Sequence, residues 1–190
     1  MLAQVLVVDK SGMPREWTNT ETGCCYIARN KVIWASDNIV KEYTGGHNCN
    51  GEISKISVPS ILGVTGPVFG VDFLNKESLY AERGILYGRD RHICCFCGNQ
   101  FPPHLLTIDH VLPKSRGGKN LWTNTVSSCG TCNKRKADRT PEEAKMHLLY
   151  VPYVPSRFEK ILLEGRNVLT DQMEFLLSRI PKTSRVWLSH

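Results

Sequence analysis

The residues best suited to chemistry lie in one stretch of the chain, between positions 94 and 136. An adjacent carboxylate and imidazole, Asp109 and His110, are followed there by two amides, Asn124 and Asn133. Four cysteines in two Cys-x-x-Cys pairs bracket these polar residues. This combination favours a zinc-stapled site that hydrolyses phosphodiester bonds with the help of a second, harder metal ion.

The two cysteine pairs have the spacing of a zinc knuckle. Cys94 and Cys97 form the first pair, and Cys129 and Cys132 form the second. Two residues between the thiols permit a tight turn that directs both sulfurs at one tetrahedral ion, and four thiolates would close its coordination sphere. The zinc would therefore stabilise the fold and not catalyse; reduced, buried thiols are the alternative. Three further cysteines lack a second pair and are expected to be buried: Cys24, Cys25 and Cys49.

Positive charge is concentrated in the same part of the chain. Between positions 83 and 139, ten basic residues stand against three acidic ones, a net charge of +7, whereas the rest of the chain sums to −1. A basic segment that coincides with a metal site is typical of a polyanion binder; a merely solvated basic face is the alternative. The candidates for phosphate contacts are Arg116, Lys134 and Arg135. The residues expected to line a nucleic-acid groove are Arg83, Arg89 and Arg91.

The composition places the chain among ordinary globular proteins, with 41% hydrophobic and 22% charged residues. No apolar run approaches the roughly 18 residues of a membrane span, so no membrane partner is expected. The first residues lack the basic region and cleavage site of a secretion signal. Eight cysteines in such a chain indicate metal binding or burial, not disulfides, and a cytoplasmic location is the expectation.

The expected fold class is α+β, in three regions: 1–80 as an α+β region without an assigned function, 81–140 as the module with the cysteines, and 141–190 as a helical region packed on the core. In the first region strands are predicted at 4–8, 31–35, 53–58 and within 64–73, a helix from Thr20 to Ala28, and a glycine-rich loop at 45–51. Helices are predicted from Pro141 to about Leu149, from Ser156 to Gly165, and from Thr170 to before Pro181.

Residues 105–108 are predicted to form a strand that leads into Asp109 and His110. Neighbouring residues on a strand point to opposite faces, so these two side chains diverge unless the strand ends or bends there. Such a break could place the carboxylate on a metal ion and the imidazole against a water molecule. A helix that begins at Asn133 would bring this amide to face Asp109.

Over roughly residues 83–145, about a third of the chain, the sequence resembles the HNH endonuclease family. The motifs that carry the resemblance are Cys-x-x-Cys-Gly, Leu-Thr-x-Asp-His-Val-x-Pro-x-Ser-Arg-Gly-Gly, Trp-x-Asn, Cys-x-x-Cys-Asn-x-x-Lys and Arg-Thr-Pro-Glu-Glu-Ala. The last is typical of the bacterial and phage branch of the family. The resemblance implies the ββα-metal fold, in which two strands and a helix surround one catalytic ion, with a four-cysteine zinc knuckle beside it.

The resemblance also implies roles for single residues. His110 would be the general base, Asn124 would orient it, and Asp109 and Asn133 would bind the catalytic ion. Asn133 stands where the family name expects histidine; it still offers an oxygen ligand, which favours Mg(II) or Mn(II). The implied products are a 5′ phosphate and a 3′ hydroxyl.

The sequence therefore predicts a metal-dependent endonuclease that acts on DNA, with duplex DNA as the expected form. The alternative is a non-catalytic, zinc-stabilised module that binds nucleic acid through the same basic surface. The target sequence, the choice between nicking and double-strand cutting, and the oligomeric state, for which a dimer is possible, do not follow from these residues.

Overall fold

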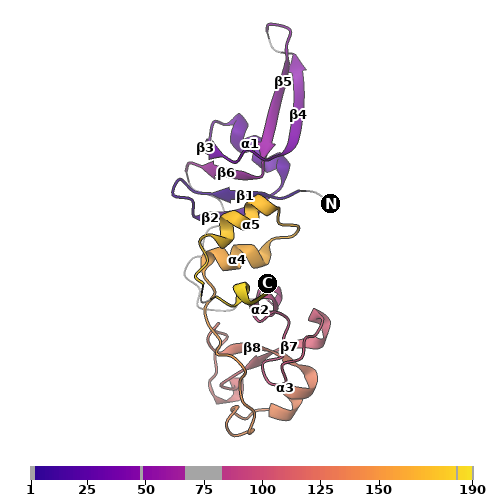
Figure 1. Ribbon diagram of the computed structural model, residues 1–190, viewed down its shortest axis with the longest axis vertical. Helices are drawn as coiled ribbons and strands as arrows, with labels where there is room; N and C mark the ends of the chain where they lie inside the picture. The colour runs from indigo at the N-terminus through magenta and orange to yellow at the C-terminus, as the bar shows by residue number, and fades with distance from the viewer. Residues whose placement is uncertain (1–2, 48, 67–82, 183, 190) are drawn as a thin grey trace. The chain divides into compact units, whose positions relative to one another are not determined.

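The computed structural model describes residues 3–47, 49–66, 83–182 and 184–189, which fall into two compact units (Figure 1). The sheet unit comprises the described residues up to 66 together with Arg157–Ile180. The cysteine unit comprises the described residues of 83–156 and 181–189. Both units combine helices and strands, which confirms the predicted α+β class.

The strands of the sheet unit are β1 (Val5–Val8), β2 (Pro14–Thr18), β3 (Val32–Ala35), β4 (Ile39–His47), β5 (Ile53–Pro59) and β6 (Ile61–Val64). Four of them form one sheet in the order β2-β1-β6-β3, with β1 parallel to β6 and antiparallel to β2. The central strand β1 has the sequence Val-Leu-Val-Val and is buried throughout, as expected for a strand with neighbours on both sides. Strands β4 and β5 pair with each other as a separate antiparallel hairpin.

Helix α1 (Thr20–Ala28) packs against the hairpin strand β5. Its first turn is capped by Asn19, whose side chain accepts a hydrogen bond from the Thr22 N–H at 2.8 Å. A glycine allows the close approach, because a Cβ at Gly23 would lie 2.9 Å from Cγ1 of Val58. The helix predicted for this segment is thus confirmed.

Helices α4 (Arg157–Glu164) and α5 (Thr170–Leu177) also belong to the sheet unit. The buried side chain of Gln172 donates hydrogen bonds to the carbonyls of Gln4 and Ser60, both at 2.8 Å. Trp17 on β2 donates through Nε1 to the Ile161 carbonyl at 2.7 Å. Both predicted helices are present, but residues 141–190 do not form one region: 157–180 complete the sheet unit, and the described residues on either side belong to the cysteine unit.

The helix predicted for residues 141–149 is wrong. Its capping box does form, since the Thr140 N–H donates to the Glu143 carboxylate at 3.0 Å and the Glu143 N–H donates to Thr140 Oγ1 at 3.4 Å. Lys145 then adopts a left-handed φ of 53°, and the Met146 N–H donates to the carbonyl five residues earlier at 2.8 Å. This hydrogen-bond pattern closes a helix, here after a single turn.

Three other expectations need correction or lie beyond the described residues. The loop predicted at 45–51 is shorter, because β4 continues through His47. Of the strands predicted within 64–73, Val64 ends β6, and positions 67–73 lie outside the described residues. Cys25 and Cys49 are exposed, so burial does not explain them. In the described parts of the chain, no helix has the length and apolar character needed to cross a bilayer.

The cysteine unit contains α2 (Arg83–Arg89), β7 (Leu106–His110), β8 (Thr125–Cys129) and α3 (Gly130–Lys136), with 3-10 turns at Pro103–Leu105, Lys114–Arg116 and Arg185–Ser189. Strands β7 and β8 are antiparallel, and α3 follows β8 without an intervening residue. Every residue of β8 is buried. Trp122 is fully buried as well.

A buried arginine holds the cysteine unit together. Arg89 has no exposed surface; it pairs with the Asp90 carboxylate at 2.9 Å and donates to the carbonyls of Trp122, Thr125 and Tyr153, each at 2.8 Å. Asp90 in turn accepts a backbone N–H of β8 at 2.7 Å. The groove-lining role predicted for Arg89 is therefore wrong: the guanidinium joins three chain segments instead.

Replacing this arginine is expected to destabilise the cysteine unit. Arg89→Met would remove the guanidinium donor from three carbonyls and the counter-charge from the buried Asp90 carboxylate, at a cost of about 3–5 kcal/mol in the free energy of unfolding. Urea denaturation measures this cost when unfolding is monitored through the hydrogen exchange of the β8 amides. The matched control is Arg135→Met, which removes an exposed arginine of the same unit. Equal unfolding midpoints for the two variants would contradict the prediction.

Candidate active site and metal centre

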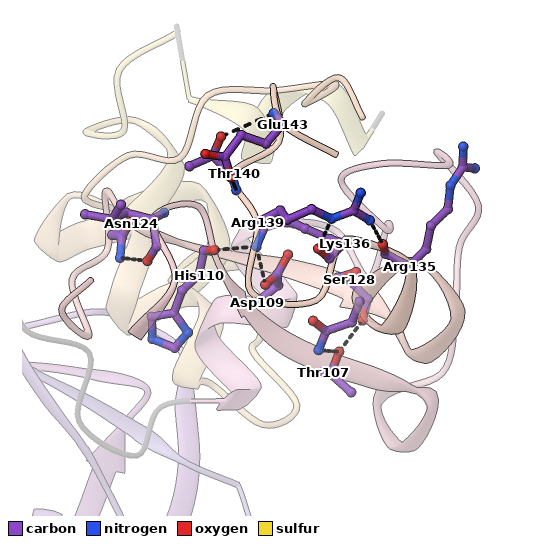
Figure 2. A network of polar contacts seen from close by, with 12 residues as sticks. Thr107, Asp109, His110, Asn124, Ser128, Arg135, Lys136, Arg139, Thr140 and Glu143 are labelled. Atoms are coloured by element: carbon purple, nitrogen blue, oxygen red, sulfur yellow. Dashed lines mark hydrogen bonds and ion pairs between the residues drawn. The ribbon is translucent and has the colours of Figure 1, made fainter. Parts of the chain in front are cut away.

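The polar residues singled out in the sequence lie on a hairpin and the helix that follows it. Asp109 pairs with Val126 and His110 with Thr125 in the β7–β8 ladder, so both residues are still within the strand. The strand therefore does not end or bend between Asp109 and His110, as it would have to for both side chains to point to the same face. Figure 2 shows the consequence: the His110 ring and the Asp109 carboxylate extend in different directions from the strand.

One face of β7 is matched by one face of α3. Thr107 and Asp109 share a strand face because they are two residues apart, and Asn133 and Lys136 share a helix face because they are three apart. The Asn133 Nδ2 donates to Thr107 Oγ1 at 3.0 Å, and the Lys136 Nζ donates to Asp109 Oδ1 at 3.0 Å. The helix thus places an amide and an ammonium over the strand that carries the carboxylate.

Asp109 is 5% exposed, and only one of its two carboxylate oxygens accepts a hydrogen bond among the described residues. Oδ1 accepts the bond from Lys136, whereas Oδ2 is buried and has no hydrogen-bond partner among the described residues. Burial raises the pKa of this carboxyl above its ordinary value, against the lowering effect of the Lys136 ammonium. A buried carboxylate oxygen without a donor is an atom that a cation can satisfy, so the residue fits the predicted role of metal ligand.

Lys136 itself has no exposed surface. Its ammonium donates to the carbonyl of His110 at 2.7 Å as well as to Asp109, as Figure 2 shows. One buried cation therefore fixes the backbone of one predicted catalytic residue and the side chain of the other. The Lys136 ammonium therefore balances the negative charge of the Asp109 carboxylate when no metal ion is bound.

The imidazole of His110 has an amide partner that the sequence did not single out. Oδ1 of Asn120 lies 2.7 Å from Nε2 of the ring. An amide oxygen only accepts hydrogen bonds, so this contact requires the hydrogen on Nε2. In the neutral ring the lone pair is then on Nδ1.

Asn124 holds the loop between the two strands. Its amide oxygen accepts the Leu112 N–H at 2.8 Å, and its amide nitrogen donates to the carbonyls of Leu112 and Lys119 at 3.2 and 3.0 Å. The structure thus brings Asn120, and not Asn124, to the imidazole. The side-chain hydrogen bonds of Asn124 are with Leu112 and Lys119, and its carbonyl accepts the Val111 N–H at 2.9 Å, so Asn124 closes the loop that follows His110.

Three residues of the site were missed: Thr107, Asn120 and Lys136. A signal existed for two of them. Position 136 follows 133 by three residues on a predicted helix, and position 107 precedes 109 by two on a predicted strand, so shared faces could have been expected. No periodicity places Asn120, because it lies in an irregular loop.

The four paired cysteines come together as predicted. The sulfur atoms of Cys94, Cys97, Cys129 and Cys132 lie within 4.8 Å of one another. Four sulfurs at about 2.3 Å from a tetrahedral zinc would stand about 3.8 Å apart. The cluster could therefore form a zinc site; Cys95 is buried but is not one of its members.

The electrostatics of the cluster favour a cation. Burial opposes ionisation of Cys94, but the N–H groups of Cys129, Cys97 and Phe96 point at its sulfur and lower the pKa of the thiol to about 7. Burial and the neighbouring sulfurs raise the pKa of Cys97 and Cys132. One thiolate is thus easily formed, and the others can ionise with it once a divalent cation lies among them.

The predicted phosphate contacts differ in their availability. Lys134 and Arg135 are exposed on α3. Arg116 is exposed too, but its guanidinium donates to both carboxylate oxygens of Glu143, at 2.6 and 2.7 Å. A phosphate that approaches Arg116 must compete with this carboxylate.

A family model described as HNH endonuclease matches residues 94–149. The matched segment includes the four clustered cysteines, β7, β8, α3 and the turn at Lys145. No curated protein matches the chain.

Proposed function

We propose that the chain, whose residues 94–149 match the HNH endonuclease family model, is a metal-dependent endonuclease that hydrolyses phosphodiester bonds of DNA. The observation that carries the proposal is the buried Asp109 Oδ2, which has no hydrogen-bond donor among the described residues. A module that only bound nucleic acid would gain nothing from a buried carboxylate with an unsatisfied oxygen.

Asp109 and Asn133 are the residues that would hold the catalytic ion. Both offer oxygen, the ligand that Mg(II) and Mn(II) prefer over softer donors. When bound, such an ion would polarise the phosphate and stabilise the charge that develops on the leaving oxygen. Lys136 keeps the Asp109 carboxylate in place through Oδ1 and leaves Oδ2 for this purpose.

His110 is the proposed general base. The contact with Asn120 places the ring hydrogen on Nε2, so Nδ1 has the lone pair that takes a proton from the attacking water. The ring becomes an imidazolium, whose Nε2–H continues to donate to the Asn120 oxygen. The water oxygen bonds to phosphorus, the bond between phosphorus and the 3′ oxygen breaks, and that oxygen takes up a proton from solvent, which gives a 5′ phosphate and a 3′ hydroxyl.

The four-cysteine cluster would hold a structural zinc ion. Because cysteine fills all four positions, no coordination site is left for water or substrate. The cluster connects the loop after α2 with the junction of β8 and α3, where Cys129 accepts the Cys132 N–H at 3.4 Å. This zinc would fix the helix that carries Asn133 and Lys136.

The substrate class follows from charge. The segment with the site contains the whole excess of positive charge in the chain, and Lys134 and Arg135 extend from the helix of the site into solvent. Such residues bind the phosphate backbone without reading its sequence. Duplex DNA is the substrate we propose.

A plasmid assay tests this function. With Mg(II) or Mn(II) present, the zinc-loaded chain should convert supercoiled plasmid into nicked or linear DNA. His110→Ala should lower the rate of this cleavage by about 10²–10⁴-fold. Zinc content and DNA affinity should not change in this variant. Linear duplex, single-stranded DNA and RNA serve as parallel substrates.

The matched control is His104→Ala, which removes an exposed histidine of the same unit. It should cleave at the wild-type rate. Cleavage by His110→Ala at that rate would rule out the assignment of the base, and no cleavage by the wild-type chain with any of the substrates would rule out the function.

A further inference from the structure

We infer that Thr107 sets which end of the Asn133 side-chain amide faces the catalytic ion. The inference rests on the proposed function, because it concerns a ligand of that ion. It adds a positioning residue that neither touches the substrate nor binds the metal. Two hydrogen bonds in series, each with a fixed direction, give Thr107 this role.

The first bond fixes the Thr107 hydroxyl. Thr107 Oγ1 lies 2.9 Å from the backbone carbonyl of Ser128, its neighbour across the β7–β8 ladder. A carbonyl can only accept, and a hydroxyl has one hydrogen to donate. The hydroxyl hydrogen therefore points at Ser128, and Thr107 Oγ1 can only accept from any other partner.

The second bond follows from the first. The side-chain amide of Asn133 faces Thr107 Oγ1 at 3.0 Å. Since Oγ1 can only accept there, the atom facing it must be the Nδ2 donor and not the amide oxygen. Oδ1 is consequently directed away from Thr107 and is available as a ligand.

The orientation matters because the two ends of an amide have opposite effects on a cation. The oxygen is a ligand for Mg(II) or Mn(II), whereas the NH₂ group presents hydrogens and repels the ion. A methyl group in place of the hydroxyl would remove the preference for one end. The hydrogen bond from Thr107 to the Ser128 carbonyl and the one from Asn133 to Thr107 thus fix the orientation of the Asn133 amide. We call this pair of hydrogen bonds the polarity lock.

Binding of Mn(II) to the zinc-loaded chain, measured from the free Mn(II) signal in electron paramagnetic resonance, tests the lock without relying on activity. Thr107→Val should weaken Mn(II) binding by about 10- to 100-fold. Thr107→Ser keeps the hydroxyl and should bind as the wild type does. Zinc content and thermal unfolding of each variant report on folding.

A second background separates orientation from a general structural role. Asn133→Asp replaces the amide by a carboxylate, which has an oxygen at both ends and therefore no wrong orientation. Thr107→Val should then have little further effect on Mn(II) binding in the Asn133→Asp chain. An equal loss in both backgrounds would overturn the inference, as would wild-type affinity in Thr107→Val.

Mn(II) binding to ligand variants separates the role of Thr107 from the metal site itself. If the wild-type chain binds Mn(II) and Asn133→Ala weakens this binding, the ligand assignment stands, and unchanged affinity in Thr107→Val overturns the polarity lock alone. If Asn133→Ala and Asp109→Ala leave Mn(II) binding unchanged, the proposed metal site is wrong, and the lock falls with it.

Discussion

Removal of zinc is expected to unfold the cysteine unit and to leave the sheet unit folded. Strands β7 and β8 form a two-stranded sheet and α3 has only seven residues, and elements this short are marginal in water without further support. Structural zinc contributes about 10–16 kcal/mol to the folding of small zinc-binding peptides. That amount matches or exceeds the net stability of a typical domain, about 5–15 kcal/mol.

Hydrogen exchange of the full chain, with and without a zinc chelator, measures this effect. Amides of β7 and β8 should lose their protection, whereas those of β1 and β6 should keep it. Cys97→Ser should behave like chelation. Cys25→Ser, in an exposed cysteine of the sheet unit, should have no effect. Unchanged protection of β8 after complete loss of zinc would contradict a structural role for the ion.

The second large effect is expected at the buried ion pair of Asp109 and Lys136. Asp109→Asn would leave the ammonium buried without its counter-charge, and Lys136→Met would do the same to the carboxylate. Loss of one partner of a buried pair costs about 3–5 kcal/mol, whereas replacing both is often nearly neutral. The double variant should therefore be more stable than either single variant.

Metal binding distinguishes the three variants. Mn(II) should bind to Lys136→Met, where it restores a positive charge beside the carboxylate and raises the unfolding midpoint. It should not bind to Asp109→Asn or to the double variant, and neither should cleave DNA. Urea denaturation without Mn(II) measures the stability of each variant, and the shift of the unfolding midpoint on addition of Mn(II) shows whether the variant binds the ion.

Arg116→Met is the control for this experiment. It breaks an ion pair that is exposed on the surface, with Glu143, and should leave the urea midpoint close to that of the wild type. Additive losses in the double variant would show that Asp109 and Lys136 do not compensate each other.

The features that the sequence predicted well depend on local spacing. The Cys-x-x-Cys pairs, the strand before Asp109 and the helix that Gly165 ends are each determined by a few neighbouring residues. Turn geometry and capping act over three or four positions, so they can be identified without the fold.

The features that the sequence did not predict have two causes, contacts between distant residues and a local backbone conformation. Arg89 is basic and precedes the first cysteine pair, which favoured a surface role, but its acceptors include carbonyls at positions 122, 125 and 153. The contact of Asn120 with the imidazole was not predicted, because it depends on the course of an irregular loop; the orienting role of Asn124 stays a prediction. The turn at Lys145 requires a left-handed backbone that its residue type does not predict.

The route of the chain through the two units sets an order for its synthesis. The sheet unit begins at β1 but is completed only by α5, whose Gln172 satisfies the carbonyls of Gln4 and Ser60. The chain leaves the ribosome from its N-terminus, so every residue of 83–156 emerges before α5 and its Gln172. The four clustered cysteines are therefore all synthesised before α4 and α5, which complete the sheet unit, and a chain interrupted after Ser156 would lack part of the unit that was made first.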